Sequence, residues 1–345
     1  MCRNRWRVAS YSFSFPRAES ASRSPRGRLL IVTKRVVITG AFSFTGAAVA
    51  RDLTRRGWSI HTLTNRRPPP GVEHITTAPL RFDSTHLRGE LAGADAFVNT
   101  YWVRLPWAGQ TFEAATDNSK LLVEAASKAG VGRLVHVSVS NAKENSNLGY
   151  YRGKAEVEAA VECSNLSYAI VCPTLIVGPT DVLTNNIAWF LRRFPIFPIP
   201  CGGDYRLQPI TLTDTGRIIA DQVESSQRAH IDAAGPDEMT FRDYIQTVAQ
   251  ACGVARPLVA VPGSLALAAL GFMQRILRDI VLTKEELFGL QQEALLSLEP
   301  PRGKESVADW LMSNGQALGR RYANDLDRHF RKGARSAVLN PLNPL

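Results

Sequence analysis

One stretch, a strand followed by a glycine turn and a helix, constrains the fold of this chain most. Val36 to Thr39 is a short β-branched run, typical of a strand buried on both faces. Gly40 ends the run, and Gly46 opens a helical pattern that stops at Gly57. A glycine permits a tight turn, and the free N–H groups and the dipole at the start of the helix attract a pyrophosphate. The segment therefore predicts a cradle for a dinucleotide.

The loop departs at one position from the usual three-glycine pattern. It reads GAFSFTG from Gly40 to Gly46, so Ser43 stands where a middle glycine is expected. Its Cβ lies where the backbone should approach a phosphate, and its hydroxyl has to compensate for this. The residues that we expect to contact the cofactor here are Gly40, Phe42, Ser43, Phe44, Thr45 and Gly46.

Further apolar strands alternate with helical segments up to about residue 175. The expected strands are 36–39, 59–63, 75–80, 96–99, 133–138 and 168–172, and the longest helix spans 110–129. This alternation predicts an α/β fold with a parallel, doubly wound Rossmann sheet. We expect a disordered or targeting extension (1–33), the Rossmann domain (34–175, with returning segments around 208–235), a smaller, mainly helical substrate lobe (176–330) and a flexible tail (331–345).

Charge, cysteines and apolar runs exclude several classes of protein. Residues 1–35 hold nine Lys or Arg and one acid, so residues 36–345 carry only about +2 of the net +10, which argues against nucleic-acid binding. The five cysteines show no metal-ligand spacing and indicate reduced thiols and no metal site. No run reaches the roughly 18 apolar residues of a membrane span. The most apolar segment, 258–273, favours a helix packed on the smaller lobe, and peripheral membrane contact is the alternative.

The first 33 residues are rich in Arg and Ser and poor in acids. This composition resembles an organelle transit segment, and a misassigned start or a disordered arm would share it. We expect a cytoplasmic protein, or an organelle-targeted one if residues 1–33 are a transit segment.

Tyr150 and Lys154 lie four residues apart near the start of an expected helix. Val157 and Val161 share their face, which indicates that the face is turned inward. An ammonium there is costly without a role, and a lysine beside a phenol lowers the pKa of the phenol. The pair is a candidate for proton transfer, although an amphipathic helix with a snorkelling lysine has the same spacing.

Other polar side chains fall near the same sheet edge. Ser138 and Ser140 end the fifth expected strand, where a hydroxyl can bond a substrate oxygen. Asn118 lies on the face of helix 110–129 that we expect to turn inward, where an amide needs partners. Three aromatic residues follow the fourth strand and are candidates for a pocket wall or for plain packing: Tyr101, Trp102 and Trp107.

The end of the second strand indicates which cofactor is bound. A carboxylate there would bind the ribose 2′-OH of NAD(H), but the chain reads Asn65, Arg66 and Arg67, with no acid nearby. Guanidinium groups suit a 2′-phosphate, and the alternative is that both arginines face solvent. We predict NADP(H), with NAD(H) as the other candidate, and these three residues as contacts.

Several segments together resemble the short-chain dehydrogenase/reductase superfamily in its extended or atypical branch, which holds the NAD-dependent epimerase/dehydratase and NAD(P)H-binding families. They follow one another in family order: TGAFSFTG (39–46), Asp83 after the third strand, DNSKLLVEAA (117–126), RLVHVSVS (133–140), YYRGK (150–154), PTLIVGP (173–179), TLTDTGRIIAD (211–221) and AGPDEMTFRDYI (234–245). The chain also looks similar to bacterial relatives of the 39 kDa accessory subunit of respiratory complex I.

This resemblance implies roles for the matching residues. Tyr150 would be the acid/base, Lys154 would hold the nicotinamide ribose and tune Tyr150, and Ser138 would orient the substrate oxygen, with Ser140 as a substitute. Asn118 would support a proton relay. The further cofactor contacts would be Asp83 at the adenine, Thr100, and Pro173 with Thr174 beside the nicotinamide.

The predicted function is an NAD(P)(H)-dependent oxidoreductase or epimerase that transfers a hydride at a carbonyl or hydroxyl carbon of a small molecule. The alternative is a non-catalytic NADPH-binding scaffold or redox sensor. Three departures favour this alternative: Ser43 in the glycine loop, the pair Arg152 and Gly153 inside the Tyr/Lys motif, and the short loop between the serine and the tyrosine. Some atypical relatives keep the cofactor and lose the chemistry.

Overall fold

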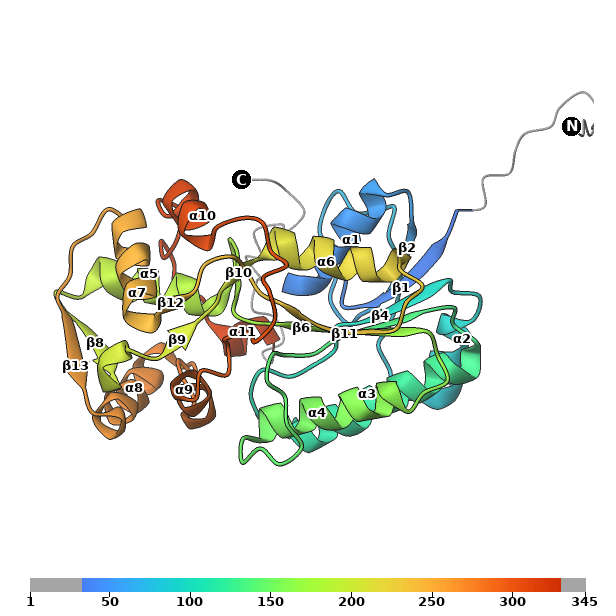
Figure 1. Ribbon diagram of the computed structural model, residues 1–345, viewed down its shortest axis with the longest axis horizontal. Helices are drawn as coiled ribbons and strands as arrows, with labels where there is room; N and C mark the ends of the chain where they lie inside the picture. The colour runs from blue at the N-terminus through green and yellow to red at the C-terminus, as the bar shows by residue number, and fades with distance from the viewer. Residues whose placement is uncertain (1–32, 330–345) are drawn as a thin grey trace, which may run out of the picture. The chain divides into compact units, whose positions relative to one another are not determined.

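The computed structural model describes residues 33–329 (Figure 1). The expected tail lies outside them, as does the expected extension apart from Thr33. Seven parallel strands form the main sheet in the order β11-β6-β5-β4-β1-β2-β3. They are β1 (Arg35–Thr39), β2 (Ser59–Leu63), β3 (Thr76–Ala78), β4 (Ala96–Asn99), β5 (Leu134–Val137), β6 (Tyr168–Pro173) and β11 (Ala229–Ala233).

Helices cover both faces of this sheet (Figure 1). One face packs on α1 (Phe44–Arg55) and α6 (Leu212–Glu224), and the other packs on α2 (Ser84–Leu91), α3 (Phe112–Ala129) and α4 (Gly149–Glu162). Successive residues of β1 pack into the two cores in turn, which explains why its sequence is continuously apolar. The predicted doubly wound α/β fold is confirmed.

Local sequence explains where two predicted boundaries moved. α3 starts at Phe112 because the Thr111 side chain accepts a hydrogen bond from the Ala114 N–H at 3.1 Å and caps the helix. α1 starts at Phe44, two residues before the expected Gly46, so that glycine lies inside the first turn.

The strand order reverses between β1 and β4, and the loops that follow these two strands lead in opposite directions along the sheet. Such a switch point opens a ligand crevice at the carboxyl ends of the strands. Thr100 ties the two loops together, since its N–H donates to Thr39 Oγ1 at 2.7 Å and its hydroxyl donates to the Thr39 carbonyl. The glycine loop and Thr100 therefore meet at this switch point.

The remaining elements form a smaller lobe around a core that includes the fully buried Tyr244, whose hydroxyl bonds Thr184 at 2.7 Å. Among residues 33–329 no helix has the length and apolar character needed to cross a bilayer. The lobe elements are β7 (Ile176–Val177), α5 (Val182–Arg193), β8 (Phe197–Pro200), η1 (Cys201–Gly203), β9 (Arg206–Leu207), β10 (Ile210–Thr211), β12 (Met239–Thr240), α7 (Phe241–Ala251), β13 (Leu258–Val261), α8 (Gly263–Leu277), α9 (Lys284–Gln291), α10 (Val307–Asn314) and α11 (Asp325–His329).

Candidate functional site

The loop after β1 has the backbone that a phosphate cradle requires. Gly40 has a φ of +69°, which favours glycine, and its N–H donates to the Leu63 carbonyl at 2.9 Å. A Cβ on Gly46 would lie 2.2 Å from the Gly40 carbonyl oxygen. A larger residue at position 46 would therefore push the helix away from the loop, and both glycines are needed for the turn.

The N-terminus of α1 faces this loop without a side-chain cap. Ser43 is the N-cap residue with an extended backbone, but its side chain makes no capping hydrogen bond. The first-turn N–H groups, which include those of Phe44, Thr45 and Gly46, have no acceptor within their own helix. An anionic pyrophosphate fits such an end. The side chain of Phe42 is buried in the core, so a cofactor contact at this position would have to come from its backbone.

The residues at the end of β2 lie beside the loop, because Thr39 pairs with Leu63. Asn65 and Arg67 are exposed there. Arg66 is half-buried, and burial lowers its pKa. The charges of Arg328 and Asp325 also act on its pKa, so the C-terminal segment lies near Arg66. Arg67 is thus the more accessible of the two predicted phosphate ligands.

The other cofactor candidates also contact protein groups. Asp83 is the N-cap of α2, and its carboxylate accepts a hydrogen bond from the His86 N–H at 2.7 Å. Thr174 is buried, and its hydroxyl donates to the Gln208 carbonyl. Pro173 ends β6 opposite Ala233 of β11. Pro173 and Thr174 thus lie at the end of β6, whereas Asp83 lies at the start of α2, five residues after the end of β3.

Lys154 lies on the inward face of α4 and is buried, with 3% of its surface exposed. Its Nζ donates to the Val137 carbonyl at 2.8 Å and lies 4.5 Å from the centroid of the Trp102 ring. Burial lowers the pKa of Lys154 to about 7, although the nearby Glu158 and Cys172 oppose this shift. The ammonium thus has a backbone carbonyl and an aromatic face as partners.

Tyr150 is surrounded by aromatic rings, with centroid distances of 6.0 Å to Trp102, 5.7 Å to Phe112 and 5.4 Å to Tyr151. Burial and, to a lesser extent, the charge of Glu286 raise the pKa of Tyr150 to about 12, although the charge of Arg104 opposes this shift. Lys154 is not among the groups that shift this pKa. The expectation that Lys154 lowers the pKa of Tyr150 is therefore corrected: burial among apolar rings dominates.

Helix α9 of the smaller lobe covers the start of α4. Glu285 accepts hydrogen bonds from the Gly149 and Tyr150 N–H groups, each at 3.3 Å. A carboxylate at a helix N-terminus stabilises the helix dipole, and Leu148, the N-cap residue, offers no side-chain cap. Next to it, Glu286 pairs with Arg104 at 2.8 Å. The lobe thus closes over the end of α4 that carries Tyr150.

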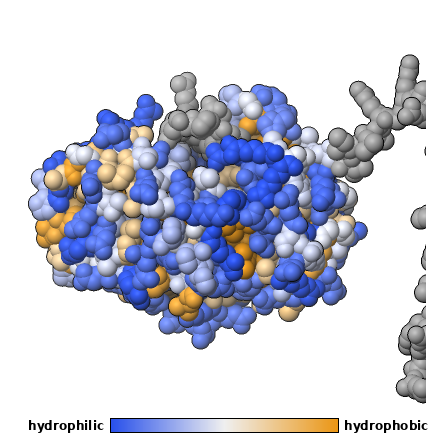
Figure 2. Space-filling view, turned by 45° about the horizontal axis from the view of Figure 1, so that its top comes forward, coloured by the Kyte–Doolittle hydropathy of each residue, from blue (hydrophilic) through white to orange (hydrophobic). Residues whose placement is uncertain are grey.

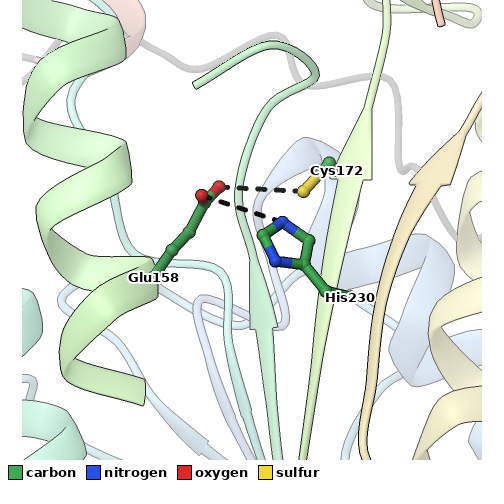
Figure 3. A group of neighbouring side chains, drawn as sticks. All are labelled: Glu158, Cys172 and His230. Carbon is green, nitrogen blue, oxygen red and sulfur yellow. Dashed lines mark hydrogen bonds and ion pairs between the residues drawn. The ribbon is translucent and has the colours of Figure 1, made fainter. Parts of the chain in front are cut away.

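A polar network that runs from the protein interior to the surface anchors the middle of α4 to the sheet (Figure 3). The Glu158 carboxylate accepts a hydrogen bond from the Ser138 hydroxyl and another from Cys172 Sγ at 3.7 Å. His230 Nε2 lies 3.7 Å from Glu158, and its Nδ1 lies 3.1 Å from Glu162. Burial raises the pKa of both Glu158 and Cys172.

This network changes the interpretation of the two serines. The expected substrate-orienting Ser138 is 6% exposed and donates to Glu158. Ser140 donates to the Ala294 carbonyl at 2.8 Å and holds a loop of the smaller lobe. Both hydroxyls therefore bond protein acceptors.

Asn118 lies away from the Tyr/Lys pair. It is half-buried, and its Nδ2 donates to the Tyr101 hydroxyl at 3.2 Å. The inward face of α3 consists of neighbouring residues such as Ala115, Ser119 and Leu122, so the predicted face was displaced by one residue. The structure therefore places Asn118 beside Tyr101 and gives it no contact with Lys154.

Trp102 contacts both members of the Tyr/Lys pair, and Gly153 makes this possible. A Cβ on Gly153 would lie 2.5 Å from Thr116 Oγ1 and 3.1 Å from the Trp102 ring. The unusual glycine in the motif therefore has a packing role, because it lets the α3 side chain and Trp102 approach α4. Aromatic packing, the plainer of the two sequence interpretations, describes Trp102 best.

Sequence reasoning missed Glu158, although a signal was present. Glu158 lies four residues after Lys154, so it shares the inward face of α4, and a buried carboxylate needs partners. Its partner His230 comes from β11, and no local pattern links the two residues. Arg104 and Glu286 are likewise joined only by the tertiary fold.

Residues 40–184 match the profile of a protein family described as NAD(P)H-binding. This segment contains the glycine loop, the crevice and α4. The predicted resemblance to the extended or atypical short-chain dehydrogenase/reductase group is confirmed.

Individual relatives are more distant. The chain is 23% identical over 241 residues to NADH dehydrogenase [ubiquinone] 1 alpha subcomplex subunit 9, mitochondrial, of Arabidopsis thaliana, which covers 66% of this chain. It spans only 60% of that relative. Among solved structures, a nucleoside-diphosphate-sugar epimerase from Staphylococcus aureus has a TM-score of 0.63 at 15% identity, covering 81% of this chain and 99% of its own. MoeE5 in complex with UDP-glucose and NAD has a TM-score of 0.61 at 15% identity, covering 82% and 98%.

Proposed function

We propose that the chain binds NADP(H) at the glycine loop and that Tyr150, Lys154 and Ser138 stabilise α4 instead of carrying out hydride transfer. The observation that carries this proposal is the burial of Lys154 between the Val137 carbonyl and the Trp102 ring. In this position the ammonium already has its partners. The chain would act as a cofactor-binding scaffold or redox sensor.

The loop residues supply what the cofactor needs from the protein. The amides from Phe44 to Gly46 would hold the pyrophosphate, and Arg67 would meet the 2′-phosphate that distinguishes NADP(H) from NAD(H). The bound nicotinamide would supply a hydride donor or acceptor. Asp83 would lie toward the adenine while it continues to cap α2.

The electrostatics of Tyr150 argue against acid/base work at neutral pH. A general acid or base is most effective when its pKa lies near the working pH, and burial raises that of Tyr150 to about 12. The Ser138 hydroxyl donates to Glu158. A substrate would have to displace this hydrogen bond before the Ser138 hydroxyl could act.

The relative from Arabidopsis is named as a subunit of NADH dehydrogenase. This name supports a role for the chain within a larger assembly. This chain spans only 60% of that relative, so its membership of such an assembly is part of our proposal.

A second candidate is an NAD(P)-dependent oxidoreductase or epimerase with Tyr150 as the acid/base. It is favoured by the structural neighbours, several of which are named as sugar-nucleotide epimerases. Tyr150 and Lys154 also keep the spacing of the motif on one helix. This function would require Trp102 to leave the face of Lys154.

Two measurements separate these candidates. Calorimetry with NADPH and NADH tests binding, and we expect NADPH to bind more tightly. Transfer of deuteride from labelled NADPH to a panel of carbonyl compounds and UDP-sugars tests turnover, and we expect none. Transfer that disappears in Tyr150→Phe would establish the second candidate, and the absence of heat with both cofactors would reject both functions.

A further inference from the structure

Helix α8 is apolar around its circumference and yet lies at the surface. Of its 15 residues only Ala266 is fully buried, whereas Leu265, Phe272 and Ile276 are 57–66% exposed. The sequence analysis favoured a helix packed on the lobe, and only one side of α8 has that contact. A helix of this composition normally has apolar surroundings on every side.

The opposite side of α8 lines an apolar cavity of about 320 Å³ inside the smaller lobe. Leu270 and Met273 form its α8 wall, and Phe190 of α5 and Leu287 of α9 belong to other walls. This volume is at the lower end of typical ligand pockets, and hydrophobic lining is their common feature.

The polar groups of the cavity wall are already paired. Asn186 donates to the Ala323 carbonyl at 3.2 Å and accepts from the Ala323 N–H at 2.9 Å. The Tyr205 hydroxyl donates to the Pro200 carbonyl at 3.5 Å. The wall therefore offers a ligand apolar contacts and few free hydrogen-bonding groups. Such a cavity favours a hydrocarbon chain over a polar molecule.

The rim beside α8 exposes positive charge. Three basic residues between positions 275 and 284 are exposed: Arg275, Arg278 and Lys284. The acids of the same stretch turn inward. Asp279 is buried and accepts from the Tyr322 hydroxyl, and Glu285 and Glu286 bond α4 and Arg104 as described above. The outer surface is therefore basic although the stretch is balanced in sequence.

We propose that α8 and the start of α9 lie on an anionic phospholipid membrane, with one acyl chain entering the cavity. Apolar side chains flanked by basic residues are the pattern of a helix at a membrane interface. Each basic residue near an anionic surface adds to the attraction. Figure 2 shows hydrophobic side chains at its left end, where Figure 1 places β13 and α8. A second copy fits less well, because a two-fold contact would bring the same three basic residues against each other.

Vesicle flotation of the full chain tests the surface. We expect binding to vesicles of equal phosphatidylcholine and phosphatidylglycerol and at least about tenfold weaker binding to phosphatidylcholine alone. Phe272→Ser with Ile276→Ser should reduce binding at least about tenfold, and Leu298→Ser, at an 89% exposed position outside this surface, should leave it unchanged. Equal binding of the double variant, or no binding by the native chain, would overturn the proposal. A native dimer that the double variant converts to a monomer would assign the surface to a second copy instead.

A probe of the cavity tests the acyl-chain site separately. cis-Parinaric acid, a fluorescent fatty acid, should gain fluorescence with the native chain and lose that gain with Leu270→Trp, which fills the cavity. Thermal melting and NADPH binding of this variant serve as controls for folding. No fluorescence gain with the native chain, or an equal gain with a folded Leu270→Trp, would contradict the acyl-chain site.

Discussion

The two ends of the expected active site are built in different ways. At the glycine loop, the features that favour a ligand belong to the backbone: the positive φ of Gly40, the close passage at Gly46 and an N-terminus with no side-chain cap. At α4 the candidate groups are side chains: Lys154 and Ser138 already bond protein acceptors, and Tyr150 is packed among aromatic rings. The difference suggests that cofactor binding and catalysis depend on separable parts of the molecule.

Backbone sites survive changes of sequence that side-chain sites do not. Ser43 departs from the glycine pattern, yet the turn still forms, because the two glycines required by its geometry are present. Trp102 and Gly153 change the surroundings of Lys154 without breaking α4. A chain can therefore lose the arrangement for turnover and still keep a dinucleotide site.

The largest expected effect comes from placing a charge at the loop. Asp is a good N-cap residue, so Ser43→Asp should preserve α1 while it repels a pyrophosphate. At an effective dielectric of about 20 such a repulsion amounts to roughly 3–4 kcal/mol. Calorimetry should show at least a hundredfold weaker NADPH binding, and the neutral control Ser43→Asn should bind as the native chain does. Equal affinities of the two variants would place the pyrophosphate elsewhere.

The packing of α4 against α3 and Trp102 is tested by Gly153→Ala. The added Cβ meets Thr116 and Trp102, so we expect a loss of about 1–3 kcal/mol in the free energy of unfolding by urea. Gly89→Ala is the control, since it lies within α2 with nothing near its Cβ and should gain about 0.5–1 kcal/mol. A stabilised Gly153→Ala would show that Trp102 does not pack as described.

Cofactor choice is tested by Arg67→Ala. The loss of one guanidinium–phosphate contact should weaken NADPH binding by about 1.5–3 kcal/mol and leave NADH binding unchanged. The exposed Arg88 of α2 offers the matched control, Arg88→Ala. If NADPH and NADH affinities fell equally, Arg67 would have no part in selecting the 2′-phosphate.

The burial of Lys154 is tested by a pH dependence of stability. The pKa of Lys154 is about 7 in the folded chain against an ordinary value of 10.5, so between these values the unfolded chain binds more protons. The free energy of unfolding of the native chain should therefore rise from pH 7 toward pH 10 relative to that of Lys154→Met. Below pH 6 the free energies of the two proteins should change with pH in parallel. Urea unfolding at pH 6, 7, 8 and 9 measures this difference. If the free energies of unfolding of the two proteins ran parallel at every pH, the Lys154 ammonium would be exposed to water and not buried.

Much of the fold could be predicted because its signals are local. Continuous apolar strands, the glycines at 40 and 46 and the caps at helix ends depend on neighbours in sequence. General rules for parallel sheets predicted that Ser138 and Thr174 lie at the carboxyl ends of their strands. These signals located the loop and the crevice.

The state of the candidate catalytic residues could not be predicted, because it depends on distant contacts. Trp102 follows β4, Glu286 lies on α9 and His230 lies on β11, and each affects α4. Helical periodicity showed that Lys154 faces inward, but it could not show which group it would meet. Because Tyr150 is buried, its pKa is raised, whereas the sequence predicted that it would be lowered.

The most direct test of the central claim is the NADPH affinity of Lys154→Met, measured by calorimetry beside the native chain. If the loop holds the cofactor and Lys154 serves the packing of α4, the two dissociation constants should agree within about threefold. A loss of a hundredfold or more, in a variant whose thermal melting shows that it is folded, would instead place Lys154 on the cofactor and contradict the separation of binding from catalysis.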